Sequence, residues 1–173
     1  MTEIICSSLR SVQKAIHDYQ PKIVLSICDD LKTFNFSAPK HIQHQIIEFD
    51  DVTEIWEGLP SKHTPPSRTH VVIIVEIAQN WHGSGNFLVH CHAGQSRSPA
   101  AAIIVVATCF PEQLVEFTRR FRDDAPWISP NRVMIEIADD ALEMDGQLVE
   151  LVYNMREPSM RAVTHPASIP IRC

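Results

Sequence analysis

The chain has 173 residues, the size of one ordinary domain. Apolar residues make up 45% and charged residues 21%, and these globular proportions exclude a disordered chain. The formal net charge of −6 argues against a nucleic-acid partner, although it leaves room for a local anion pocket. The longest apolar run, residues 100–110, is about half of what a bilayer span needs, so we expect no membrane partner.

The cysteines are odd in number and include no C-x-x-C pair; they are Cys6, Cys28, Cys91, Cys109 and Cys173. The start of the chain has neither a basic segment nor a long apolar core. Both features favour a cytoplasmic chain without a disulfide framework. We expect Cys6, Cys28 and Cys109 to be buried as small hydrophobic side chains, and Cys91 to be an exception because of the residues around it.

Strand and helix patterns alternate along the chain. Short β-branched and apolar runs predict strands at residues 3–6, 22–28, 44–49 and 87–90. Apolar residues at helical spacing predict helices at residues 9–16, 67–81, 99–109, 112–122, 131–143 and 147–156. This alternation predicts an α/β fold with a mainly parallel sheet. We expect one domain at residues 1–157, followed by a tail at 158–173 that has three prolines, little pattern and a surface position.

The segment Val89–Pro99 carries the densest chemistry. It reads Val-His-Cys-His-Ala-Gly-Gln-Ser-Arg-Ser-Pro and joins a predicted strand to a predicted helix. Ligands of open α/β sheets bind beyond the carboxyl ends of strands, which is where this loop lies. We expect Ser98 to cap the helix, Pro99 to be its first residue, and Gly94 to permit a turn that a side chain would hinder.

This loop also predicts an anion-binding nest. The backbone N–H groups from His92 through Ala93, Gly94, Gln95 and Ser96 to Arg97 are expected to point at one centre, in front of a helix N-terminus. Arg97 adds a planar two-pronged donor for two phosphate oxygens. Cys91 lies at the bottom of such a nest, where the same donors stabilise its thiolate as a nucleophile.

Three neighbours of this cysteine receive supporting roles. Ser98 is expected to donate its hydroxyl to the thiolate, which makes sulfur a better leaving group when a thiophosphate breaks down. His90 is expected to hydrogen-bond the loop backbone and fix its shape. His92 is expected to point outward, where it either shapes substrate choice or is an inert solvent-facing ring.

The sequence His-Cys-x-Ala-Gly-x-Ser-Arg-Ser resembles the signature of the cysteine-based protein tyrosine and dual-specificity phosphatases. More closely, the chain resembles a bacterial group of small tyrosine-phosphatase-like proteins with an Asp-rich turn before the signature and an Ala-Pro-x-x-x-Pro-Asn segment after it. Here these are residues 49–52 and 125–131, and the resemblance covers residues 1 to about 155. It implies a sheet of four or five strands with helices on both sides, phosphomonoester hydrolysis, and no metal or other cofactor.

The resemblance also implies a general acid on a loop before the signature. Asp51 is the first candidate, because it matches the family's aspartate, and Asp50 is the second; a turn cap after the strand is the alternative for both. The family places this aspartate nearer to the cysteine than here, where the gap is forty positions. The extra length falls at residues 57–66, and Glu54 and Glu57 are left as outside candidates.

The remaining candidate residues can be interpreted structurally as well as functionally. Asn131 matches the family, where it braces the signature loop, but it also fits a helix N-cap. The histidines at 41, 44, 90 and 92 form no compact set of four ligands, so no metal is expected. His70 fits local packing or hydrogen bonding. The arginines at 119, 120 and 122 fit a solvated helix face or a patch that guides substrate, and Trp56 and Trp127 are candidates to border the pocket.

The leading hypothesis is a cysteine-dependent phosphatase for a phosphoprotein or a small phosphomonoester. One alternative is a non-protein substrate, a phosphoinositide or an RNA 5′-phosphate; loops for phosphoinositides tend to carry lysines that this loop lacks. Another is a phosphate-binding module without turnover, which would need a lost catalytic group. The signature frame argues against sulfurtransferase or arsenate reductase chemistry.

Overall fold

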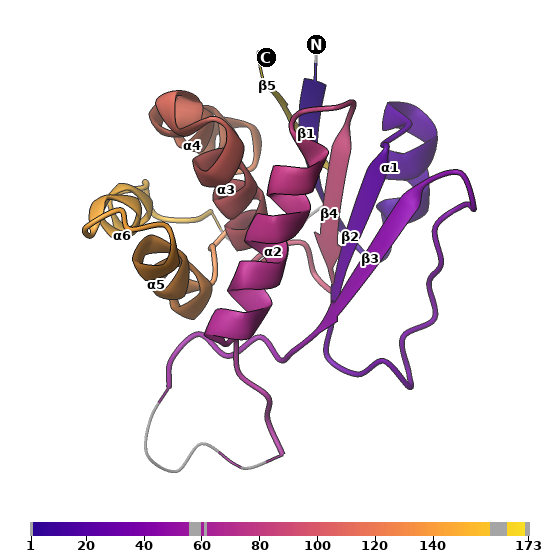
Figure 1. Cartoon of the computed structure of the whole chain (residues 1–173), viewed down its shortest axis with the longest axis horizontal. Coiled ribbons are helices and arrows are strands. Elements are labelled where there is room, and N and C mark those ends of the chain that lie inside the picture. The colour runs from indigo at the N-terminus through magenta and orange to yellow at the C-terminus, as the bar shows by residue number, and fades with distance from the viewer. Residues whose placement is uncertain (1, 56–59, 61, 160–165, 172–173) are drawn as a thin grey trace.

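Five strands form one sheet in the order β3-β2-β4-β1-β5 (Figure 1). The structure is a computed structural model and describes residues 2–55, 60, 62–159 and 166–171. The strands in spatial order are β3 (Gln43–Glu48), β2 (Ile23–Cys28), β4 (Phe87–Cys91), β1 (Thr2–Ser8) and β5 (Ala167–Ile171). The first four are mutually parallel, and β5 runs antiparallel to β1. The α/β fold with a mainly parallel, five-stranded sheet is therefore confirmed.

Helices cover both faces of this sheet, as predicted. On one face, α1 (Val12–Tyr19) packs its apolar side against residues of β1, β2 and β4. The other face carries the larger core, which the remaining helices complete. These are α2 (Arg68–Trp81), α3 (Arg97–Cys109), α4 (Leu114–Asp124), α5 (Arg132–Ala141) and α6 (Gln147–Tyr153), with a 3₁₀ turn at Pro111–Gln113 before α4.

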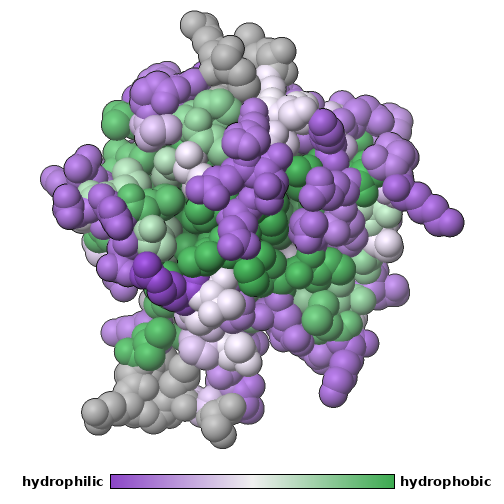
Figure 2. Space-filling view, viewed as in Figure 1, coloured by the Kyte–Doolittle hydropathy of each residue, from purple (hydrophilic) through white to green (hydrophobic). Residues whose placement is uncertain are grey.

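The burial pattern explains this layering. All residues of β2 and β4 are buried, as expected for central parallel strands covered on both faces. Edge strand β3 is mostly exposed, and Ile46 is one of its solvent-facing residues. Figure 2 shows hydrophobic residues in a band across the middle of the face that α2 covers. Ile73 of α2 is one of the exposed large hydrophobic residues. No helix in the described part of the chain is long and apolar enough to span a membrane.

Helix α3 begins earlier than the sequence indicates. Its first residue is Arg97 and its N-cap is Ser96, so Ser98 is not the cap and Pro99 is the third helical residue rather than the first. Proline is still tolerated there, because the first four N–H groups of a helix have no intrahelical partner. The shift frees the Ser98 hydroxyl for the site described below.

The predicted tail is also wrong in part. Residues 167–171 form β5, which pairs with β1 from Cys6↔Ala167 to Thr2↔Ile171 and buries Ala167 and Ile169. Prolines obscured this strand because they are disfavoured inside sheets, but an edge strand accepts them. The C-terminal strand therefore closes the β1 edge of the sheet, and residues 160–165 lie outside the described residues.

Candidate active site

The loop after β4 keeps its curved form because its carbonyl groups are bonded outward. Three of these carbonyls accept hydrogen bonds from backbone N–H groups of two distant segments. The pairs are Leu9 N–H to His92 O (3.1 Å), Ser129 N–H to Gln95 O (2.7 Å) and Asn131 N–H to Ser96 O (3.1 Å). In a planar trans peptide the next N–H points opposite to the carbonyl. The N–H groups of residues 93, 96 and 97 therefore face the inside of the loop, as the predicted nest requires.

Gly94 is the residue that makes this curve possible. Its φ of +73° is a left-handed conformation that other residues rarely adopt. A Cβ there would lie 2.8 Å from the backbone nitrogen of Ser8 and 2.9 Å from the carbonyl carbon of Ser7. Its own N–H donates to the Cys91 Sγ at 3.3 Å. The loop therefore lies directly on the end of β1 with one donor aimed at the sulfur.

Cys91 ends β4 and is 2% exposed at the base of the loop. Its Sγ lies 3.2 Å from the Ser98 hydroxyl, the contact that the sequence predicted. On the other side of that hydroxyl, the Cys6 thiol donates to it at 3.3 Å. Burial raises the pKa of Cys6 far above its ordinary value, so Cys6 stays a neutral thiol. Since Ser98 accepts from Cys6, its own proton can go to Cys91 at 3.2 Å or to the Ser7 carbonyl at 3.5 Å, and Cys91 is the nearer of the two.

Arg97 is anchored by one nitrogen and leaves the opposite edge of its guanidinium group open. The side chain is 3% exposed, and its Nη1 donates to the Phe49 carbonyl at 2.6 Å and forms an ion pair with Asp29 at 2.7 Å. Within the described residues the buried Nε has no hydrogen-bond partner. The Nε–Nη2 edge is the fork that binds two oxygens of a phosphate. The contacts to Phe49 and Asp29 therefore do not use this edge.

The sequence reasoning missed Asp29. It directly follows β2 and lines a hollow of about 180 Å³ together with Cys91 and His92. The rule that locates the cysteine loop, that ligands bind beyond the carboxyl ends of strands, also applies to this residue. The Asp29-Asp30 pair at a strand end was a usable signal.

Asp51 and Asp50 have different partners. Asp51 Oδ1 accepts hydrogen bonds from the Ser96 hydroxyl at 2.6 Å and from the Asn131 amide at 2.8 Å, and its Oδ2 lies 3.9 Å from Arg97 Nε. Asp50 instead accepts from the Thr64 N–H at 2.7 Å. The structure thus brings Asp51 to the nest and ties Asp50 into its own loop.

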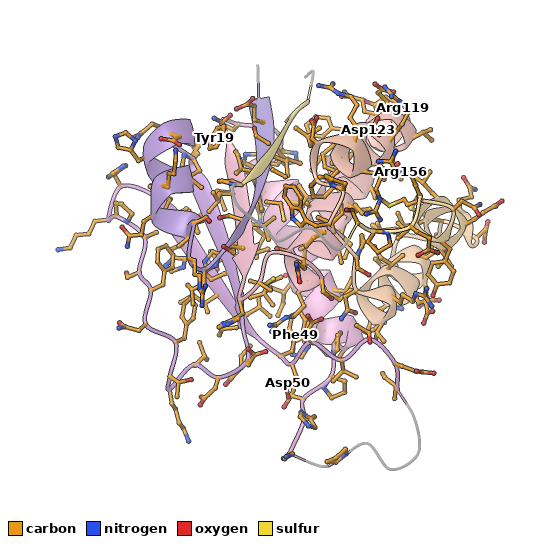
Figure 3. The ribbon with its side chains drawn as sticks, turned by 180° about the vertical axis from the view of Figure 1, so that it is seen from behind. Tyr19, Phe49, Asp50, Arg119, Asp123 and Arg156 are labelled. Atoms are coloured by element: carbon orange, nitrogen blue, oxygen red, sulfur yellow. The ribbon has the colours of Figure 1, made fainter. Side chains whose placement is uncertain are left out.

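Two labelled residues in Figure 3 place this difference in the molecule. Asp50 points away from the sheet, toward the loop that extends beyond it, and Phe49 lies nearer the helices. His70 stacks on the Phe49 ring with centroids 4.8 Å apart and bonds the cap residue Ser67, the local role that was expected. Glu54 lies on the same loop and is exposed, whereas Glu57 and Trp56 are outside the described residues.

Asn131 combines both of its predicted roles. It is the N-cap of α5, accepting from the Met134 N–H at 3.0 Å, and it is fully buried. Its amide also donates to Asp51 and to the Val52 carbonyl at 3.0 Å. Through its backbone N–H it holds the cysteine loop at Ser96. One side chain therefore connects the helix, the acidic loop and the nest.

His90 is completely buried behind the cysteine, and His92 is exposed as expected. The His90 Nε2 lies 2.6 Å from the Ser26 hydroxyl. Burial lowers the pKa of His90 to about 4, although its interaction with the Cys91 backbone opposes that shift. His90 is therefore neutral at physiological pH.

The arginine cluster on α4 lies away from this site. Figure 3 shows Arg119, Asp123 and Arg156 at the opposite end of the molecule from Asp50. Arg119 pairs with Glu116 and Asp123. The buried Arg122 instead donates to backbone carbonyls of the segment that precedes α5. This arrangement does not support a patch that guides substrate.

The hollows beside the nest are acidic. The one at Cys91 is lined by Asp29 and Asp30, and a separate one of about 510 Å³ is lined by Asp50, Asp51 and Glu54. Their described linings hold no lysine or arginine. Among the described residues, no three His, Cys, Asp or Glu side chains are grouped to hold a metal.

Comparison with known proteins shows the fold. No family model and no curated protein matches the sequence. Among solved structures, the Yvh1 phosphatase domain from Chaetomium thermophilum is 19% identical with a TM-score of 0.60, covering 85% of this chain and 93% of that one. DUSP15 is 17% identical with a TM-score of 0.59, covering 89% and 93%. PTPMT1 in complex with PI(5)P is 14% identical with a TM-score of 0.57, covering 82% and 90%. The chain has the fold of these three proteins, while the closer bacterial resemblance stays a prediction.

Asp29→Ala is expected to make the empty site less stable and phosphate binding tighter. The substitution leaves Arg97 held by the Phe49 carbonyl but removes its closest carboxylate, at a cost of about 1 to 2 kcal/mol. Urea unfolding and calorimetry with inorganic phosphate measure both effects. Asp30→Ala removes the same charge without touching Arg97 and is expected to change both quantities far less. Weaker phosphate binding by Asp29→Ala would contradict this account.

The free energy of unfolding is expected to decrease as the pH falls, because His90 takes up a proton more readily in the unfolded chain than in the folded one. The unfolded histidine takes up a proton near its ordinary pKa, whereas the folded one resists protonation until about pH 4. Stability is thus lost as the pH falls below the unfolded pKa, by about 2 kcal/mol between pH 7 and pH 5. Urea unfolding at both pH values should show this loss in the wild type and a smaller one in His90→Gln. Equal losses in the two proteins would exclude it.

Proposed function

We propose that this chain is a cysteine-dependent phosphatase that hydrolyses phosphate monoesters on protein side chains. The observation that carries the proposal is that one loop brings together the Cys91 sulfur, the inward N–H groups and the Arg97 side chain, whose Nε has no hydrogen-bond partner among the described residues. A carboxylate, Asp51, lies 3.9 Å from that Nε. Together they supply a nucleophile, an anion cradle and a proton donor.

In the first step the Cys91 thiolate attacks phosphorus and the bond to the leaving oxygen breaks. The three non-bridging oxygens are held by the loop N–H groups and by the Nε–Nη2 edge of Arg97, so most of the rate comes from positioning and electrostatics. A bound phosphate dianion beside Asp51 favours the protonated carboxyl group. That proton passes to the leaving oxygen, which departs as a neutral hydroxyl.

In the second step water hydrolyses the cysteinyl-phosphate. The Asp51 carboxylate accepts a proton from water, the new oxygen–phosphorus bond forms, and the sulfur–phosphorus bond breaks. The Ser98 hydroxyl lies 3.2 Å from the sulfur and donates to the departing thiolate. Phosphate leaves, and the site returns to its initial state.

The acidic hollows support a protein substrate with a single phosphate at the site. Carboxylates at Asp29, Asp30, Asp50 and Glu54 repel further phosphate groups, and the described linings hold no lysine or arginine to bind them. Polyphosphorylated lipids and RNA 5′-triphosphate are disfavoured by the same charges. The similar structure of PTPMT1 was solved with PI(5)P, a monophosphorylated inositide, which makes this class the comparison to include.

The wild-type protein is expected to hydrolyse an aryl phosphate and a phosphotyrosine peptide without added metal and with no loss on adding EDTA. Cys91→Ser should retain its fold and bind vanadate or phosphate but show less than about 1% of the activity, since the hydroxyl is a far weaker nucleophile. Phosphate release on a panel with PI(5)P, a bisphosphorylated inositide and RNA 5′-triphosphate should rank the peptide first. Full activity of Cys91→Ser would refute the nucleophile, and binding without hydrolysis by the wild type would favour a phosphate-binding module.

Asp51→Asn is expected to lower turnover on phosphotyrosine by roughly 10²- to 10³-fold, in the range of a lost general acid. The amide keeps an acceptor for Ser96 and Asn131, so the loop should stay in place. A nitrophenyl phosphate has a better leaving group and should lose less. The alkaline limb of the pH–rate profile should flatten.

Asp50→Asn is the matched control, because Asp50 bonds Thr64 rather than the nest. It should leave the alkaline limb in place. A profile that loses this limb in Asp50→Asn or Glu54→Gln, and keeps it in Asp51→Asn, would assign the acid to another residue.

A further inference from the structure

Behind the cysteine, a chain of hydrogen bonds runs through three strands. The His90 Nε2 lies 2.6 Å from the Ser26 Oγ on the neighbouring strand β2. The same Oγ lies 2.8 Å from the His44 Nε2 on edge strand β3. The His44 Nδ1 in turn accepts from the Ala38 N–H at 3.3 Å. Ser26 and His90 are fully buried.

The direction of this chain follows from counting protons. A backbone N–H can only donate, so the His44 Nδ1 is the acceptor and, in a neutral ring, the proton is on Nε2. His44 therefore donates to Ser26. The Ser26 hydroxyl must place its own proton on its other partner, the His90 Nε2. His90 is then left with its proton on Nδ1.

Both rings are in surroundings that keep them neutral. Burial lowers the pKa of His44 as well as that of His90. Phe36 packs edge-on against both rings, with centroids 5.3 Å from His44 and 5.0 Å from His90. Phe34 stacks over His90 at 6.2 Å. Phe34 and Phe36 therefore pack against the two histidines of this hydrogen-bond network.

The remaining His90 nitrogen lies at the start of the cysteine loop. Nδ1 is buried and completes no hydrogen bond within the described residues. The ring nevertheless interacts with the Cys91 backbone. A proton on Nδ1 points a donor at this backbone, whereas the other tautomer points a lone pair there. The state of His90 therefore bears on how Cys91 is held.

We propose that Ser26 and His44 are positioning residues, which fix His90 as its Nδ1–H tautomer and thereby hold the Cys91 backbone in its attacking position. The catalytic part of this proposal rests on the proposed phosphatase function. His44 acts through Ser26 and His90 and touches no substrate. The segment that donates the Ala38 N–H thus connects to the nucleophile through three side chains, those of His44, Ser26 and His90.

The test compares two amides at position 44. His44→Gln can place an amide N–H near the former Nε2 and donate to Ser26, whereas His44→Asn reaches only the former Nδ1 position and accepts from Ala38. Two-bond ¹H–¹⁵N spectra of the imidazole rings report the His90 tautomer directly. We expect the Nδ1–H form in the wild type and in His44→Gln, and loss of that form in His44→Asn. With a phosphotyrosine peptide, kcat should fall about tenfold in His44→Asn alone, the effect of one hydrogen bond, with KM within about twofold.

An Nε2–H tautomer of His90 in the wild type would overturn the proposal. Equal behaviour of the Gln and Asn variants in both the spectra and kcat would also overturn it, because a purely structural role does not distinguish them. The spectra decide the hydrogen-bond chain even if the wild type releases no phosphate, an outcome that refutes the proposed function instead.

Discussion

The site depends on one constraint: the carbonyl groups of the cysteine loop are bonded outward by chain segments that are remote in sequence. Leu9, just after β1, holds one carbonyl, and the turn before α5 holds two more at Gln95 and Ser96. Because each planar peptide pairs an outward carbonyl with an inward N–H, these bonds turn several backbone donors toward one centre, where an anion can bind, without the use of a charged side chain. Gly94 lets the loop lie directly on β1. The cradle thus exists before any anion enters it.

The buried guanidinium of Arg97 requires counter-charge in the empty site, and two carboxylates lie close to it. Asp29 forms a direct ion pair, and Asp51 lies just beyond hydrogen-bond reach of Nε. An entering phosphate dianion takes over the open edge of the guanidinium and repels both carboxylates. Asp29 and Asp51 thus supply counter-charge to Arg97 in the empty site, and the proposed phosphatase reaction gives Asp51 a second task as its acid.

Sequence patterns predicted much of this arrangement because strand and helix periodicity is local. The strands at 22–28 and 87–90 lie within one residue of their observed bounds, and the loop between β4 and α3 places Cys91, Gly94 and Arg97 as expected. Three features depend on tertiary contacts that no local pattern predicts. β5 forms only because β1 offers an open edge, the ion pair of Asp29 with Arg97 forms only when β2 lies beside β4, and the bonds of Ser26 to both His44 and His90 need β2 between β3 and β4. The longer spacing before the cysteine also left Asp50 as an alternative to Asp51 in the sequence, whereas the contacts with Ser96 and Asn131 distinguish the two residues.

Two hydrogen bonds that close the loop at its base explain how Asp51 can lie forty residues before Cys91 and still reach the site. The Asp50 N–H donates to the Thr64 carbonyl at 2.8 Å, and the Thr64 N–H donates back to the Asp50 carboxylate. These two bonds close the segment between residues 50 and 64 at its base. Asp51 is then located by Ser96 and Asn131, which both hydrogen-bond its carboxylate, and not by the length of chain that follows. Extra chain between these two bonds therefore leaves the carboxylate 3.9 Å from Arg97 Nε, and its entropic cost grows only slowly with loop length.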